Sequence, residues 1–120
     1  MAKRGRRRER LAAPQSEYAD AEGNVLTLRG SLTVGSRRAY AEALSGAGAR
    51  PASSREDDWQ RAQELLFERL AVSWVIADAP IVRQRELLAR LRVASPEERA
   101  WVRDVMRRHV AEHFPDVTAP

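Results

Sequence analysis

Cysteine is absent from the 120 residues of this chain. Its absence excludes disulfide bonds, thiolate metal sites and catalysis by a cysteine nucleophile. Such a composition is compatible with a reducing compartment. A chain of this length forms one domain around one modest core, and it buries roughly two-thirds of the surface that the unfolded chain exposes.

Long hydrophobic runs are absent as well. No apolar stretch approaches the roughly 18 residues that a membrane-spanning helix requires, and residues 11–14 are too short for the core of a signal peptide. We therefore expect a cytoplasmic protein without a membrane partner. Apolar residues make up 43% of the chain and charged residues 32%, so the composition predicts a folded protein, not a disordered one.

The net charge of +4 is concentrated at the N-terminus. Residues 1–10 hold six basic residues and one acid, a net charge of +5, which leaves −1 for residues 11–120. We predict a flexible basic arm over 1–16. Such an arm can attach to the phosphates of nucleic acid in a salt-dependent way, although a solvated terminus without a function explains the same charges. The residues concerned are Lys3, Arg4, Arg6, Arg7, Arg8 and Arg10.

The remaining chain has the patterning of a single domain over 17–116, followed by a frayed end at 117–120. The β-favouring run at 24–29 predicts a strand, which can pair with 17–21 around a turn at Gly23. Apolar residues at three- and four-residue steps elsewhere indicate helices. The expected helices are 37–44, 55–77, 81–93 and 96–113, with an internal linker at 45–54. The predicted fold class is therefore mainly α: a small helical domain of about four helices with a short N-terminal β-strand or hairpin.

Capping signals support several of these helix boundaries. Thr33 or Ser36 can cap the first helix, and Gly46 is placed to end it. The sequence Ser-Pro-Glu-Glu at 95–98 offers a capping serine, proline in the first helical position and acids beside the positive end of the helix dipole. The start of the helix at 96 is consequently the best-defined boundary in the chain.

Two histidines invite a metal-site interpretation. His109, Glu112 and His113 match the H-x-x-E-H pattern of a group of zinc proteases, in which two histidines share the metal and the glutamate is the general base. A third protein ligand is expected well downstream of His113, where the chain has almost ended. Because histidine is also favoured at a helix C-terminus by the dipole, we prefer the structural interpretation and expect no metal.

Catalytic groups are otherwise lacking. The acid pairs 57–58 and 97–98 fall in the first turns of predicted helices, where carboxylates are favoured by the dipole alone. No nucleophile or phosphate-binding loop accompanies either pair. We therefore expect a protein that is not an enzyme and needs no cofactor.

The segment 70–77 is apolar nearly all round, and four short elements would not cover it completely. A client-binding or self-association surface is then plausible, and tryptophan is enriched at binding hot spots. Packing in the core is the alternative for the same side chains, and a structural subunit of a larger assembly is a further possibility. The residues assigned to this surface are Trp59, Leu66, Phe67, Leu70 and Trp74.

The order of motifs resembles the tail assembly chaperones of long-tailed (siphovirus-type) bacteriophages with flexible tails and of related prophages. The corresponding features are Gly23, Leu-Arg at 28–29, Leu-Thr-Val-Gly-Ser-Arg-Arg at 32–38, the helix around 65–76 and Phe-Pro-Asp at 114–116. Val25 and Thr27 occupy the place of an aromatic residue expected in the strand. The resemblance, over about 23–116, implies a chaperone in the bacterial host cytoplasm. It would coat the apolar helical tape-measure protein, help tail-tube subunits polymerise around it, and leave before the tail matures.

Overall fold

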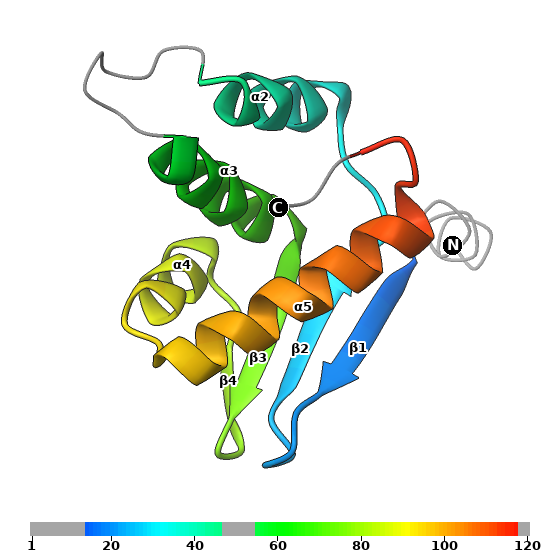
Figure 1. The fold of residues 1–120 in the computed structure, drawn as a ribbon. Coiled ribbons are helices and arrows are strands. Elements are labelled where there is room, and N and C mark those ends of the chain that lie inside the picture. The colour runs from blue at the N-terminus through cyan, green and yellow to red at the C-terminus, as the bar shows by residue number, and fades with distance from the viewer. Residues whose placement is uncertain (1–13, 47–54, 118–120) are drawn as a thin grey trace, which may run out of the picture.

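In a computed structural model of the chain, the described residues are 14–46 and 55–117. Within these ranges the chain forms four strands and four helices (Figure 1). In chain order they are β1 (Gln15–Ala19), β2 (Val25–Arg29), α2 (Val34–Leu44), α3 (Arg55–Leu70), β3 (Ala71–Ile76), β4 (Ala79–Ile81), α4 (Gln84–Arg92) and α5 (Pro96–His113).

The strands form one antiparallel sheet in the order β1-β2-β3-β4. Two tight turns connect its hairpins. Gly23 has φ +83° in the first turn, where a residue without Cβ is favoured. In the second turn Ala77 and Asp78 have φ +49° and +65°, and two consecutive left-handed residues are the mark of the two-residue turn that suits the twist of a hairpin. The edge strand β4 contains Pro80, which cannot donate to a further strand.

The sheet shows that the mainly α prediction was wrong, because the fold is mixed α/β. The expected helix at 55–77 ends at Leu70, and residues 71–76 form a central strand paired with β2. A short apolar run cannot be assigned to helix or strand by periodicity alone. Here Val72, Trp74, Val75 and Ile76 are β-branched or aromatic residues, which fit a pleated surface, and their preference decides the outcome.

The other predicted elements agree more closely with the structure. The hairpin of β1 and β2 forms as expected, although β1 begins at Gln15, inside the range assigned to the arm. The Thr33 hydroxyl accepts a hydrogen bond from the Ser36 backbone and so caps α2. Helix α4 begins at Gln84, later than predicted, because 79–81 form β4. Helix α5 covers 96–113 as predicted, with a complete capping box between Ser95 and Glu98.

The core lies between the sheet and α5, which crosses the face of β1 to β3 (Figure 1). Leu26, Leu28 and Trp74 from the strands meet Val102 and Met106 from the helix, and all five are buried. Helices α2 and α3 pack against each other beyond one end of the sheet. No helix in the described ranges is both long and apolar enough to cross a membrane.

Candidate partner-binding site

Four of the five residues assigned to a partner surface lie in the core. Leu66, Phe67, Leu70 and Trp74 are each 0–1% exposed, and the rings of Phe67 and Trp74 meet edge to face with 6.0 Å between centroids. They therefore form no surface in this conformation. The segment that looked uncovered is covered because β3 brings it into the centre of the sheet, beneath α5. Trp59 stands apart from them, with 49% of its surface exposed.

Trp59 lines a hollow of about 310 Å³ between the outer faces of α3 and α5, with the end of α4 at one side. We call it the α3–α5 groove. Its lining residues are Glu56, Trp59, Gln60, Gln63, Glu64, Leu91, Arg92, Arg99, Arg103 and Arg107.

The groove has an excess of positive charge, with four arginines against two glutamates. Arg92 is already paired: its guanidinium donates two hydrogen bonds to Glu64, at 3.2 and 3.3 Å. These bonds raise the pKa of Arg92 above its ordinary value. Arg99 donates to the Arg92 carbonyl oxygen at 2.5 Å, which fixes the rim of the groove. Within the described residues, Arg103 has no hydrogen-bond or ion-pair partner and is exposed.

Arg99, Arg103 and Arg107 follow one another at four-residue steps along α5 and so lie on one helix face. We call this set the arginine row. The site residues predicted from the sequence do not include it, because the apolar stripe of the same helix dominates its pattern. The signal was nevertheless present: three cations at four-residue spacing lie within 96–113, a helix whose boundaries the sequence predicts correctly.

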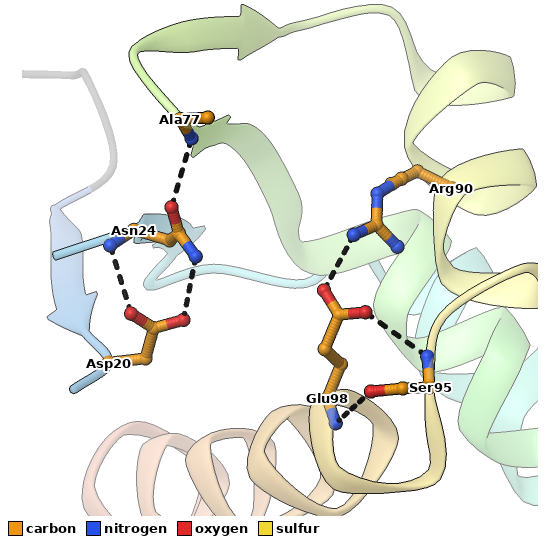
Figure 2. A network of polar contacts seen from close by, with 6 residues as sticks. All are labelled: Asp20, Asn24, Ala77, Arg90, Ser95 and Glu98. Atoms are coloured by element: carbon orange, nitrogen blue, oxygen red, sulfur yellow. Dashed lines mark hydrogen bonds and ion pairs between the residues drawn. The ribbon is translucent and has the colours of Figure 1, made fainter. Parts of the chain in front are cut away.

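A second hollow, of about 610 Å³, opens at the end of the sheet where the two hairpin turns lie. Figure 2 shows the polar groups on its two sides. On one side the Asp20 carboxylate accepts from the Asn24 backbone N–H and side-chain amide, at 2.9 and 3.0 Å. The side-chain Oδ1 of Asn24 accepts from the Ala77 N–H at 3.0 Å, so one side-chain amide joins both hairpin turns.

On the other side Glu98 joins the capping box to α4 (Figure 2). It accepts hydrogen bonds from the Ser95 N–H at 3.1 Å and from the Arg90 guanidinium at 2.6 Å. The Ser95 bond is the larger cause, and the two together hold the pKa of Glu98 below its ordinary value. The same guanidinium lies 5.2 Å from the centroid of the Trp74 ring. No described residue accepts a hydrogen bond from the Trp74 indole N–H.

The carboxylates of Asp20 and Glu98 both accept hydrogen bonds that hold turns and helix ends together. The second hollow is therefore built of structural polar contacts.

The two histidines also have structural contacts. The His109 ring is fully buried, and its Nε2 lies 2.8 Å from the Arg29 carbonyl oxygen. Since a carbonyl only accepts, Nε2 carries the proton and Nδ1 accepts from the Tyr18 hydroxyl at 2.8 Å. His113 lies 3.1 Å from the Ser16 hydroxyl. Both nitrogens of His109 are thus occupied. No group of three or more candidate ligands occurs among residues 14–46 and 55–117.

The basic residues of the predicted arm, Lys3, Arg4, Arg6, Arg7, Arg8 and Arg10, lie outside the described residues. Most of the expected linker, 47–54, also lies outside them. Comparison of the chain with known proteins finds no match among protein families, characterised proteins or solved structures.

Proposed function

We propose that this chain is a non-enzymatic phage tail assembly chaperone that binds the tape-measure protein during tail assembly. The observation that carries the proposal is the half-exposed Trp59 at the wall of the α3–α5 groove. A large aromatic side chain beside a concave surface is the usual anchor of a protein–protein contact. A groove between two helices suits a helical partner, which lays its apolar face into it.

The positions of the family-like motifs support the same proposal. Arg37, from the Leu-Thr-plus-basic segment, donates to Asp116 at 2.9 Å. Its guanidinium also lies 5.4 Å from the centroid of the Phe114 ring. Motifs separated by about 80 residues in the sequence thus meet in the fold, where they tie α2 to the end of α5. A chaperone family would share the residues that stabilise its fold, whereas the surfaces that bind different clients would vary.

The proposal includes further partners. Tail-tube subunits would polymerise on the coated client in the bacterial host cytoplasm, and copies of this chain would associate with one another along it. Because the tape-measure protein is long and apolar, many copies would be required to cover its surface. Self-association would therefore be strongest in the presence of the client.

Co-expression with a tape-measure fragment tests the proposal directly. The fragment should accumulate in the soluble fraction with this chain and in the pellet without it, and it should co-purify with the chain. A Trp59→Ala variant should release part of the fragment to the pellet, because the proposed anchor is removed. If the fragment is equally insoluble with and without the chain, the proposed function is wrong.

The charge of residues 1–10 supports a second candidate, a nucleic-acid-binding accessory protein that acts through its basic arm. Six phosphate contacts would give log Kd against log salt a slope of about 5. Deletion of 1–10 should abolish that binding and leave the solubility of the tape-measure fragment unchanged. Binding that is independent of salt would exclude the arm as a nucleic-acid site.

A further inference from the structure

The walls of the α3–α5 groove differ in chemistry. The α3 wall presents Trp59 with two glutamines and two glutamates, and the lining also includes the apolar side chain of Leu91 from α4. The α5 wall presents the arginine row. A ligand that fits both walls has an apolar flank toward Trp59 and a negatively charged flank toward α5.

The charges that line the groove decide whether a positively or a negatively charged partner is favoured. Glu64 is ion-paired with Arg92, which leaves Glu56 as the other acid of the lining. The arginine row places three cations there, of which Arg107 already has an interaction partner. Arg103 has no pairing group among the described residues, so its charge is available to a ligand. A complementary acidic surface would be steered toward the groove and held in register by these charges.

We propose that the α3–α5 groove binds an acidic amphipathic segment of the client protein. Its apolar side chains lie against Trp59 and Leu91, and its carboxylates pair with the arginine row. The inference rests on the proposed function and adds to it the chemistry of the segment that is bound. It also separates the client-binding surface from the buried apolar residues of α3 and β3.

A nucleic acid is the other polyanion that arginines and a tryptophan can bind. The Glu56 carboxylate, on the same wall of the groove as Trp59, disfavours it. A phosphate backbone carries a charge at every nucleotide and would meet this carboxylate, whereas an amphipathic helix can confine its charges to the flank that faces α5.

Peptide binding tests the inference on the full-length chain. The probes are two amphipathic peptides with leucine at the same positions, one with glutamate and the other with lysine at all polar positions. We expect the Leu–Glu peptide to bind and to change the tryptophan fluorescence, and the Leu–Lys peptide not to bind. Equal binding of both peptides, or binding of neither, overturns the inference.

Matched variants locate the contact. Arg103→Glu should weaken binding of the Leu–Glu peptide by roughly five- to tenfold, and Trp59→Ala by roughly tenfold or more. Arg85→Glu is the control, because it makes the same charge change at an exposed position of α4 outside the groove. Thermal unfolding of each variant should confirm an intact fold. Equal affinities of the Arg103→Glu and Arg85→Glu proteins overturn the inference.

Competition and co-expression separate the alternatives. A single-stranded oligonucleotide should not displace the Leu–Glu peptide, and displacement that Arg103→Glu abolishes would identify the groove as a nucleic-acid site instead. The solubility of the tape-measure fragment is measured in parallel. If wild type and Arg103→Glu keep that fragment equally soluble, the proposed function stands and the inference about the groove fails.

Discussion

Replacing His109 by leucine should destabilise the protein by about 3–5 kcal/mol at neutral pH. Leucine has nearly the volume of histidine, so the cost arises mainly from hydrogen bonding. The Arg29 carbonyl oxygen and the Tyr18 hydroxyl each lose a partner at 2.8 Å. Each lost hydrogen bond costs about 1 kcal/mol, and a carbonyl left unsatisfied in the interior adds about 1–3 kcal/mol. His109→Gln should recover part of the loss, because an amide can both donate and accept.

The same residue should make stability depend on pH. Burial, with a smaller contribution from neighbouring His113, lowers the pKa of His109 below its ordinary value. The unfolded chain therefore binds a proton near pH 6.5 that the folded chain does not yet accept. His109 contributes its full stability above about pH 6.5, and this stability is lost as pH falls toward the lowered pKa. The slope is at most about 1.4 kcal/mol per pH unit for one proton.

Urea unfolding at pH 7.5, 6.5 and 5.5, followed by tryptophan fluorescence, to which the buried Trp74 contributes, measures both effects. The gap in unfolding free energy between wild type and His109→Leu should narrow as the pH falls below 6.5. Groups that lie far from His109 have the same surroundings in both proteins, so their contributions largely cancel in the comparison. If the difference in unfolding free energy stays constant from pH 7.5 to 5.5, His109 is not a neutral ring held by two hydrogen bonds.

Four further substitutions test the local structure, and equilibrium unfolding measures each. Gly46→Ala should cost about 1–2 kcal/mol, because φ is +78° there and the new Cβ would lie 2.7 Å from an Asp58 oxygen. Gly35→Ala, in helical conformation where the new Cβ would meet only the Thr33 hydroxyl oxygen at 3.9 Å, should stabilise the protein by up to about 1 kcal/mol. Changes of the same sign at the two glycines would contradict this reasoning. Ser95→Ala should cost about 1 kcal/mol through loss of the cap, and an unchanged midpoint would contradict the capping box. Asn24→Asp should destabilise by about 1 kcal/mol as its charge meets the carboxylate of the first turn, and the loss should diminish below pH 4.

The sequence predicts those parts of the fold that depend on short-range chemistry. The Ser95–Glu98 box and Pro96 define the start of α5 from a few adjacent residues. Gly23 likewise marks the turn between β1 and β2. The end of α3 is different, because an apolar run suits either a helix or a central strand. Only pairing with β2, about 45 residues earlier in the chain, makes residues 71–76 a strand.

In the candidate site, too, some features depend on adjacent residues and others on distant parts of the chain. Trp59 could be singled out from its place beside acids in a first helical turn, and it is the predicted surface residue that remains exposed. Leu66, Phe67, Leu70 and Trp74 could not be separated from it by periodicity, because the strand that buries them had been assigned to the helix. The arginine row lines a groove only because α5 lies opposite α3. That arrangement depends on the order of strands in the sheet.

The junction between α3 and β3 has a consequence for how chain length can vary. Leu70 ends the helix and Ala71 begins the strand, with no residue between them. Each residue turns an α-helix by about 100° about its axis. One residue inserted or deleted at this junction would therefore rotate all of α3 by that angle while β3 kept its register on β2. Trp59 would then point away from α5, so homologous chains should accommodate length differences elsewhere and keep this junction fixed.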